Sequence, residues 1–478
     1  MTRERLTFGN GVHRPVVSAR AITTTGALAD EPAPVTLSRL ETWDWAWGGL
    51  LIFTVLLFFR PQDQLPGLQN SHVSDIAAVT GLCALFARNL SRGRPLVRMT
   101  PELLGVLAFG LVIVLTIPTS IWPTGAFNVF RNLYLPIVLI YLLMANTLTS
   151  PKRIERIAWV IVLAFGAVAA RVLVDYFVRG IGSGEGRAQA PFGGFFQNPN
   201  DLALNIVTFL PLVFMYIKRP GPTLKRLLCV GIAFMMLAVL VLTRSRGGTL
   251  GFVAMLATFL IVARVLTPTM IIAGMLAGIF VLPALPASFW ARMSSITDAR
   301  KDDSGSREER RLLLIQGWTV FAERPLTGVG AGQFKTYWRP GLSRKWHETH
   351  NMLLQVASEV GVFGLIAFSF LIWQGFSAAT WTRKRLGWIH RRRPKRKSYA
   401  EPEDGLDTDE RAWLHSHATA MVACMMGWFV CAMFASVALN WTFYYVLGLS
   451  ACTRDVVRMR ESAYAKAKAL AIREASAA

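Results

Sequence analysis

The sequence contains few charged residues for its length. Only 17% of its 478 residues are Asp, Glu, Lys or Arg, whereas 53% are hydrophobic. A water-soluble domain carries about 25% charged residues. Together with a mean hydropathy of +0.40, this deficit indicates a protein whose main solvent is lipid, and it excludes an intrinsically disordered chain.

Cysteine is also scarce, with five residues in the whole chain. Four of them lie inside apolar runs and the fifth follows one, so their spacing fits neither a disulfide framework nor a metal site. We interpret them as small residues that pack between helices. They are Cys83, Cys229, Cys424, Cys431 and Cys452.

Acidic residues are outnumbered by Lys and Arg, 29 to 51, which gives a formal net charge of +22. This excess could suggest nucleic acid as a partner. The basic residues, however, fall in short clusters between apolar runs rather than on one face of a soluble domain. We therefore interpret the basic clusters as signals that orient the chain in a membrane. The expected partners are membrane lipids, and no nucleic acid is expected.

Long apolar runs predict an all-α, polytopic integral membrane protein. A spanning helix needs roughly 20 mostly apolar residues, and we expect about 12 such helices. They cover residues 43–59, 73–87, 102–122, 131–149, 154–178, 199–217, 226–243, 248–266, 269–286, 351–382, 412–435 and 438–453.

Alternate short connections between these runs are rich in Lys and Arg, which marks them as cytoplasmic. Both ends of the chain are then cytoplasmic, and the long connection that ends at His350 lies outside. The expected organisation is a cytoplasmic tail (1–42), the first nine spans (43–286), an extracytoplasmic loop (287–350), the last spans (351–453) with a basic cytoplasmic loop (383–411), and a cytoplasmic tail (454–478).

Two of these connections stand out. The run from Arg383 to Lys397 holds nine Lys and Arg residues and no acidic one, and we interpret it as a topology anchor against anionic lipid headgroups. The loop 287–350 is mostly polar but contains several aromatic residues, among them Trp318 and Phe334. A loop of this length is usually functional or disordered, and its aromatic residues favour short packed helices.

The first candidate site is the segment T-R-S-R-G-G, which places Arg244 and Arg246 between two apolar runs at the outer side. Arginine stays charged and presents a planar fork that suits phosphate. The Gly247–Gly248 pair would let a ligand approach the backbone. Both arginines could instead extend to lipid headgroups, and the sequence leaves the two interpretations open.

The second candidate lies in the outer loop, where Arg307, Arg310 and Arg311 precede an expected helix. Three glycines come after this helix in the motif G-V-G-A-G, residues 328–332. A dinucleotide fingerprint would need a strand before the glycines and a helix after them. We interpret them instead as a tight turn that packs the preceding helix against the next part of the chain.

The third candidate is the segment H-E-T-H-N, residues 347–351, at the outer mouth of a long apolar helix. His347 and His350 are suited to proton exchange near neutral pH, and Glu348 lies between them. No third ligand accompanies the H-x-x-H spacing, so we expect no metal. Glu359 lies further on, within the apolar run, where a carboxylate is expensive and marks a functional or packing role.

Four motifs in this order resemble the O-antigen ligase superfamily. They are F-F-Q-N-P-N-D-L-A (195–203), T-R-S-R-G-G (243–248), R-P-L-T-G-V-G-A-G-Q-F (324–334) and H-N-M-L-L-Q-V-A-S-E-V-G-V-F-G-L (350–365). The resemblance extends over roughly residues 100–450 and depends on the order and spacing of the motifs. The superfamily includes O-antigen ligases, O-antigen polymerases and protein O-oligosaccharyltransferases.

The resemblance implies a glycosyltransferase of the inner (cytoplasmic) membrane that needs no metal or other cofactor. Its site would face the periplasm, and its donor would be a glycan linked to undecaprenyl diphosphate. The acceptor would be a lipid, a growing glycan or a protein. The functional residues of the family correspond here to Arg246, His350 and Arg310, or to a neighbour of Arg310 at 307 or 311.

Physical chemistry suggests a role for each of these residues. Arginines would stabilise the diphosphate leaving group, and His350 would accept the proton of the attacking hydroxyl, with Glu348 as the substitute base. Direct attack would invert the anomeric carbon. Further substrate contacts are expected from Arg244, Arg307, Arg311, His347, Glu348 and Asn351.

Other functions remain open at this point. A polysaccharide polymerase of the same superfamily would use the same residues. A transporter would place its charges along a permeation path and favour internal repeats, but the charges here concentrate at one face and no convincing repeat is found. A purely structural subunit of an assembly complex would not require arginines at these positions.

Overall fold

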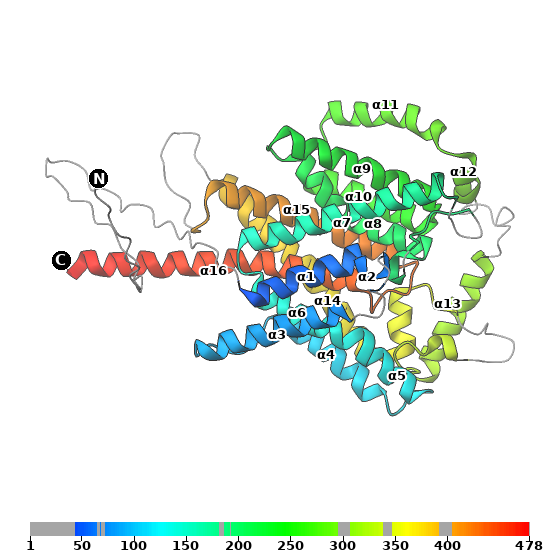
Figure 1. Cartoon of the computed structure of the whole chain (residues 1–478), viewed down its shortest axis with the longest axis horizontal. Coiled ribbons are helices and arrows are strands. Elements are labelled where there is room, and N and C mark those ends of the chain that lie inside the picture. The colour runs from blue at the N-terminus through cyan, green and yellow to red at the C-terminus, as the bar shows by residue number, and fades with distance from the viewer. Residues whose placement is uncertain are drawn as a thin grey trace, which may run out of the picture. The chain divides into compact units, whose positions relative to one another are not determined.

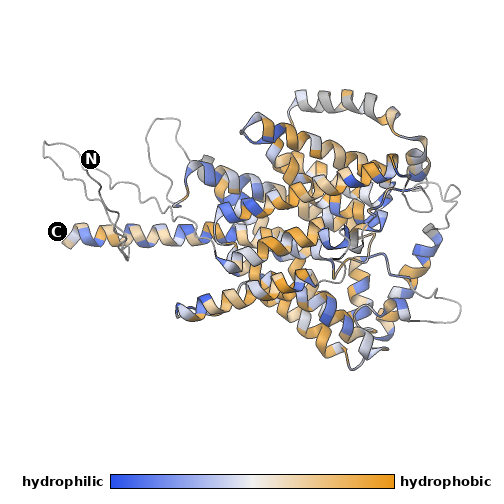
Figure 2. Cartoon of the chain, in the orientation of Figure 1, coloured by the Kyte–Doolittle hydropathy of each residue, from blue (hydrophilic) through white to orange (hydrophobic). Residues whose placement is uncertain are grey.

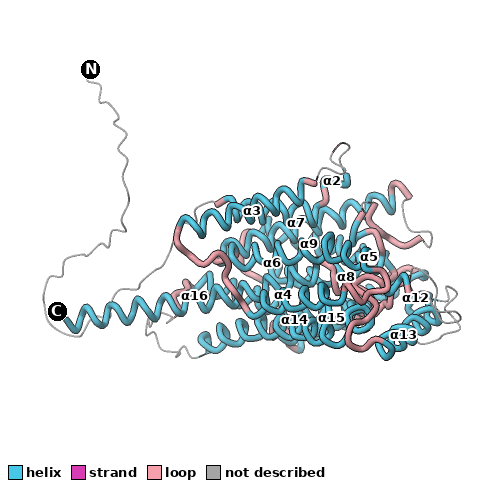
Figure 3. The backbone as a smooth tube through the Cα atoms, turned by 90° about the horizontal axis from the view of Figure 1, so that it is seen from below, coloured by secondary structure: helices cyan, strands magenta, loops and turns pink. Residues whose placement is uncertain are grey.

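Helices form the regular structure throughout the described part of the chain, and no strand occurs there (Figures 1 and 3). The computed structural model describes residues 44–64, 67, 72–180, 186–191, 193–294, 306–337, 347–391 and 404–477. All of them lie in one compact unit, residues 36–478. The expected tail 1–42 and the part of the basic run that follows Arg391 lie outside the described residues.

Connections of different lengths separate the helices. In chain order they are α1 (Trp45–Phe59), α2 (Pro61–Gln64), α3 (Val73–Ser91), α4 (Pro101–Thr116), α5 (Pro123–Val129), the π-helical turn η1 (Phe130–Tyr134), α6 (Leu135–Thr147), α7 (Pro151–Phe177), η2 (Gly194–Phe196), α8 (Pro199–Lys218), α9 (Thr223–Thr243), α10 (Arg246–Val262), α11 (Pro268–Ala284), α12 (Ala287–Ser294), α13 (Ser306–Glu323), η4 (Phe334–Thr336), α14 (Met352–Arg391), α15 (Thr408–Ala432) and α16 (Trp441–Ala477).

Seven stretches of helix are long and apolar enough to cross a membrane in the described part of the chain. Three shorter apolar helices accompany them, namely α1, α4 and α10. Each expected span overlaps a helix. Two of these helices, α11 and α16, belong neither to the seven long apolar stretches nor to the three shorter apolar helices. The structure therefore confirms an all-helical chain with several apolar helices, and the number of about 12 spans stays a prediction.

Several helices begin where a side-chain cap is followed by proline. The side chains of Thr100, Ser150 and Asn198 accept hydrogen bonds from backbone N–H groups of the first turn, and Pro101, Pro151 and Pro199 occupy the next position. The cap satisfies a donor that the helix leaves unpaired, and proline at that point gives up no intrahelical hydrogen bond. These pairs fix the first residues of α4, α7 and α8.

The long helices run roughly parallel or antiparallel to one another (Figure 3). Apolar residues dominate the long helices, hydrophilic residues gather toward helix ends, and the C-terminal half of α16 mixes hydrophilic and apolar residues (Figure 2). Small residues allow close approach, as helix packing in membranes requires. Between α1 and α3, a β-carbon at Gly49 would lie 2.6 Å from Gly81 Cα.

An ion-pair network is buried between α4 and α16. Arg454 of α16 donates to both carboxylate oxygens of Glu102, at 2.6 and 3.0 Å, and to Asp455 Oδ1 at 2.8 Å. Arg98 pairs with the other oxygen of Asp455 at 3.0 Å. Glu102 is fully buried, so loss of its arginine partner would cost about 3–5 kcal/mol. The network fixes α16 against the start of α4.

Helix α14 is interrupted at Gly361, where φ is 76° and ψ is −169°. The interruption leaves carbonyl groups that the glycine-rich loop satisfies: Val329 N–H donates to Ser358 O at 2.9 Å, and Gly330 N–H donates to Glu359 O at 2.8 Å. The Gly332 N–H donates to the Glu359 carboxylate at 2.8 Å. The three glycines thus form a turn packed against a helix, as the sequence predicted, and Glu359 has a packing role.

A methyl group at position 330 should destabilise this contact. Gly330 has φ of 102°, and a β-carbon there would overlap Ser120 Oγ. We expect Gly330→Ala to lower the unfolding free energy by roughly 2 kcal/mol or more, through strain and overpacking. Thermal unfolding in detergent measures the effect. The control is Gly221→Ala, whose β-carbon would meet nothing within 4 Å; equal midpoints for the two variants would contradict the role given to Gly330.

Candidate active site

The ends of five helices meet at the candidate site. The first turns of α8, α10 and α14 lie there, together with the last turn of α9 and the residues that come after α15. These ends carry three of the four motifs that were singled out in the sequence. The fourth, the glycine-rich loop, supports α14 from the side of α13.

A buried arginine connects α8, α9 and α10. Arg187 Nε donates to the carbonyl of Thr243 at 2.8 Å, and its Nη2 donates to Asn200 Oδ1 at 2.8 Å. The same amide oxygen accepts a hydrogen bond from Ser245 Oγ at 3.0 Å. Ser245 in turn caps α10 by accepting from Gly248 N–H at 3.2 Å. This network fixes the point at which α10 begins.

Arg244 and Arg246 lie on either side of that capping serine. Arg244 adopts left-handed backbone, with φ of 48°, and its guanidinium lies 3.5 Å from the Tyr176 hydroxyl at the end of α7. Arg246 is half-buried at the first position of α10. Its backbone therefore lies at the positive end of a helix dipole, where anions are stabilised.

The glycine pair after Arg246 serves helix packing. A β-carbon at Gly248 would lie 2.6 Å from Ala203 Cβ of α8, and one at Gly247 would lie 2.9 Å from Phe434 Cβ. The pair thus brings the start of α10 close to α8 and to the residues after α15. Both glycines also line a small cavity.

His350 is held in a strained backbone conformation before α14. Its φ is 51°, and its N–H donates to Ser436 Oγ at 3.0 Å. Asn351 caps α14 by accepting from Leu354 N–H at 3.0 Å, and its Nδ2 donates to Met433 O at 3.2 Å. These contacts with the residues after α15 keep the histidine in the left-handed region, as the surroundings of a strained residue must.

The His350 imidazole is neutral at physiological pH. Burial lowers its pKa, and the nearby Arg310 guanidinium lowers it further, to about 4. Desolvation disfavours the charged form of histidine, and a neighbouring cation acts in the same direction. His350 can therefore accept a proton across the whole neutral range.

Of Arg310 and Arg311, whose side chains the structure describes, Arg310 faces the site. It lines the small cavity with Asn200 and with Ser245, Gly247 and Gly248 from the start of α10. Arg311 points elsewhere, is 72% exposed and lies 3.6 Å from Glu308. The side chain of Arg307 lies outside the described residues. Of the arginines that can be compared, Arg310 is thus the one near both His350 and α10.

The other predicted site residues surround this centre. His347 Nδ1 lies 3.2 Å from Glu309 Oε1, which ties the start of α13 to the segment before α14. Glu348 is exposed, and its carboxylate is within electrostatic range of Asp201 and Glu359. Among the described residues, no group of three or more His, Cys, Asp or Glu side chains could hold a metal ion.

Sequence reasoning missed three residues that position the site. Arg187 and Ser436 belong to none of the motifs. Arg187 contacts Asn200, 13 residues away, and Thr243, 56 residues away, whereas Ser436 contacts His350, 86 residues away. Asn200 was part of the motif Q-N-P-N but received no role. Of these three residues, only Asn200 could have been found from the sequence, because an amide side chain beside the start of a helix often makes polar contacts.

One comparison with known proteins found a family that matches part of this chain. Residues 231–369 match the model of the Wzy_C family, which is described as O-antigen ligase. The matched segment contains Arg246, Arg310 and His350. No curated protein matches the chain. This match supports the resemblance to the O-antigen ligase superfamily over these residues. Together with the apolar helices, it points to a membrane protein.

The proximity of Arg310 to His350 can be tested without any substrate. Arg310→Gln removes the nearby cation, so the pKa of His350 should rise above about 4, whereas Arg311→Gln should leave it unchanged. NMR titration of protein labelled with ¹³C-histidine measures this pKa, and His350→Gln assigns the signal. An equal pKa in both variants would mean that Arg310 lies elsewhere.

Proposed function

We propose that this protein is a membrane glycosyltransferase that moves a glycan from undecaprenyl diphosphate to an acceptor hydroxyl. The observation that supports it best is the meeting of Arg310, His350 and the start of α10 at one end of the helices. A general base beside several cations suits a reaction that releases an anionic leaving group. The family match supports the class of reaction.

Arg246 and Arg310 would bind the donor diphosphate. As the bond between the anomeric carbon and the diphosphate oxygen breaks, its electron pair passes to the leaving group. Guanidinium groups neutralise that charge through paired N–H donors, and they act most strongly where water is excluded. The N-terminus of α10 adds its dipole.

His350 would act as general base. The acceptor oxygen forms the new bond to the anomeric carbon from the face opposite the diphosphate, and its proton passes to the neutral imidazole. One displacement of this kind inverts the configuration and needs neither a covalent intermediate nor a metal ion. Asn351 and Ser436 hold the histidine in place, and Glu348 is the substitute base.

The reaction is proposed to occur at the periplasmic face of the inner membrane. The alternation of basic and uncharged connections supports this orientation, with both tails inside and residues 287–350 outside. That segment contributes α12, α13 and η4. Arg310 of α13 would then reach the site from the periplasmic side.

Transfer in vitro tests the proposal and identifies the acceptor. Purified protein would receive lipid-linked donor and, in separate reactions, a lipid A core, a glycan or a protein. A ligase would modify the first, a polymerase would extend the second, and an O-oligosaccharyltransferase would modify the third. Transfer should persist in EDTA. Transfer to no acceptor would contradict the proposal, as would activity that required Mg²⁺ or Mn²⁺.

Orientation can be tested in the same assay. A water-soluble acceptor that cannot cross the membrane is added to right-side-out or to inverted membrane vesicles that contain the donor. Transfer should occur only in the right-side-out vesicles. Transfer only in the inverted ones would place the site on the cytoplasmic face.

The pH dependence of transfer should reflect the lowered pKa of His350. The base is active when neutral, so kcat/KM should stay constant as pH falls from 7 to about 5 and should halve near pH 4. Enzyme kept at low pH and assayed at pH 7 controls for unfolding. A half-maximal value near pH 6.5, the ordinary pKa of histidine, would argue against a buried histidine as the base.

Arg246 and His350 should differ in their effect on donor binding. Arg246→Lys keeps the charge but loses the planar fork, so donor affinity should fall by roughly tenfold or more. His350→Ala should abolish turnover and leave donor affinity nearly unchanged, because a base for the acceptor need not contact the diphosphate. Donor titration in nanodiscs measures both. If His350→Ala also lowers the affinity for the glycan donor, His350 contacts that donor and Glu348 becomes the candidate base.

A further inference from the structure

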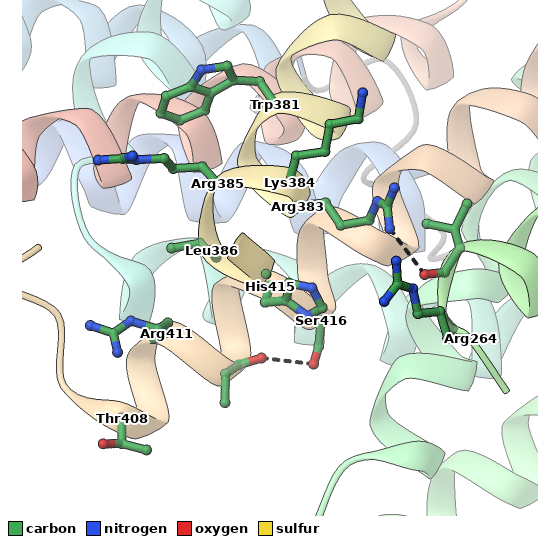
Figure 4. Close-up of a pocket in the computed structure, with 14 residues that line it drawn as sticks. Arg264, Trp381, Arg383, Lys384, Arg385, Leu386, Thr408, Arg411, His415 and Ser416 are labelled. Carbon is green, nitrogen blue, oxygen red and sulfur yellow. Dashed lines mark hydrogen bonds between the residues drawn. The ribbon is translucent and has the colours of Figure 1, made fainter. Parts of the chain in front are cut away.

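A second cavity lies at the opposite ends of the helices that build the candidate active site. It has a volume of about 970 Å³ and is enclosed by the end of α10, the late turns of α14 and the first turns of α15 (Figure 4). The 17 residues of α10 separate it from Arg246 by about 25 Å at 1.5 Å per residue. The two sites are therefore distinct.

The lining of this cavity is strongly basic. Its charged side chains are Arg264, Arg383, Lys384, Arg385 and Arg411, and none of its lining residues is acidic. Arg385 is neutralised by Glu461 at 2.7 Å, and Arg411 is neutralised by Asp404. The remaining three cations have no acidic partner within 4 Å among the residues that the structure describes.

Helix capping explains only part of this arrangement. Arg383 Nη1 donates to Val262 O at 3.4 Å, and Lys218 donates to Ala263 O at 2.9 Å, so both stabilise the C-terminus of α10. Arg383 Nε, however, is buried and has no hydrogen-bond partner within the described part of the chain. A buried N–H without a partner is costly and indicates a missing acceptor.

A second guanidinium group, that of Arg264, lines the same cavity as this unpaired donor. Figure 4 shows Arg264 and Arg383 directed toward the same region beside the end of α10. Two like charges repel each other in partly buried surroundings unless an anion lies between them. Planar N–H forks at such a place match the oxygens of a phosphate group.

The rest of the wall is apolar or carries hydroxyl groups. Trp381 and Ala412 supply apolar surface, and Thr408 and Ser416 supply hydroxyls. A smaller cavity of about 290 Å³ adjoins it through Ala412, His415 and Ser416, and its charged lining residues are Lys218, Arg219 and Asp409. A site with cations on one wall and apolar surface on another suits an amphiphile with a negatively charged head.

We propose that this cavity is a binding site for a phosphate group, carried by an anionic phospholipid of the surrounding membrane. The phosphodiester would bind to Arg264 and Arg383, with Lys384 nearby, and an acyl chain would lie against Trp381 and Ala412. Basic pockets between membrane helices bind such headgroups. The start of the basic run at Arg383 is then part of a specific site as well as a topology anchor.

Lipid binding by the full-length protein tests the proposal. Native mass spectrometry in detergent compares phosphatidylglycerol with phosphatidylcholine, which has the same phosphodiester but no net charge. The wild-type protein should retain phosphatidylglycerol selectively. In R264Q/R383Q its affinity should fall about tenfold or more, because two charge-assisted contacts are lost. The control R92Q/R94Q removes the same charge from exposed positions between α3 and α4 and should bind like wild type.

Two further measurements complete the test. One distinguishes a lipid phosphate from a free phosphate, and the other replaces a variant that fails to fold. Binding of inorganic phosphate without phosphatidylglycerol, lost in R264Q/R383Q, would keep the phosphate site but assign it to a soluble ligand. If R264Q/R383Q aggregates, R264K/R383K replaces it and should still lose selectivity, because lysine lacks the fork. Equal retention of phosphatidylglycerol by wild type and either variant would overturn the proposal. None of these measurements depends on glycan transfer.

Discussion

The interruption of α14 at Gly361 is the constraint on which the candidate site depends. A helix in lipid cannot leave backbone groups unpaired, so a break requires another segment to supply donors and acceptors. The glycine-rich loop does so, and Val362 N–H donates to Pro325 O at 2.8 Å in return. This exchange attaches the end of α13 to α14. It thereby holds Arg310, at the other end of α13, on the same side of the molecule as His350.

Much of the helical framework could be predicted from local signals. The apolar runs at 154–178 and 199–217 correspond to α7 and α8, because hydropathy alone identifies long apolar helices. The capping residue and the proline that follows it set the exact start of each helix. The prediction was less complete for α16, which continues to Ala477 beyond the expected end of its span at 453. Its later turns mix polar and apolar residues, and such a pattern defines no membrane span.

The arrangement of side chains within the candidate site could be predicted only in part. Adjacent residues of a helix point about 100° apart, so the direction of Arg310 rather than Arg311 depends on how α13 rotates against α14. Arg187 and Ser436 act through partners far away in the chain, and no local pattern encodes such contacts. The family motifs indicated which segments meet, and the packing of the helices determined which atoms face each other.

The contact between α10 and α15 should constrain which residues occur together at positions 251 and 431 in related sequences. A β-carbon at Gly251 would overlap Cys431 Sγ, whose thiol lies 3.6 Å from the carbonyl of Gly247. The volumes of positions 251 and 431 are thus coupled: a side chain can grow at one only if the other shrinks. Among related sequences the two positions should vary together, and their pairing would report the distance between these two helices in proteins of unknown structure.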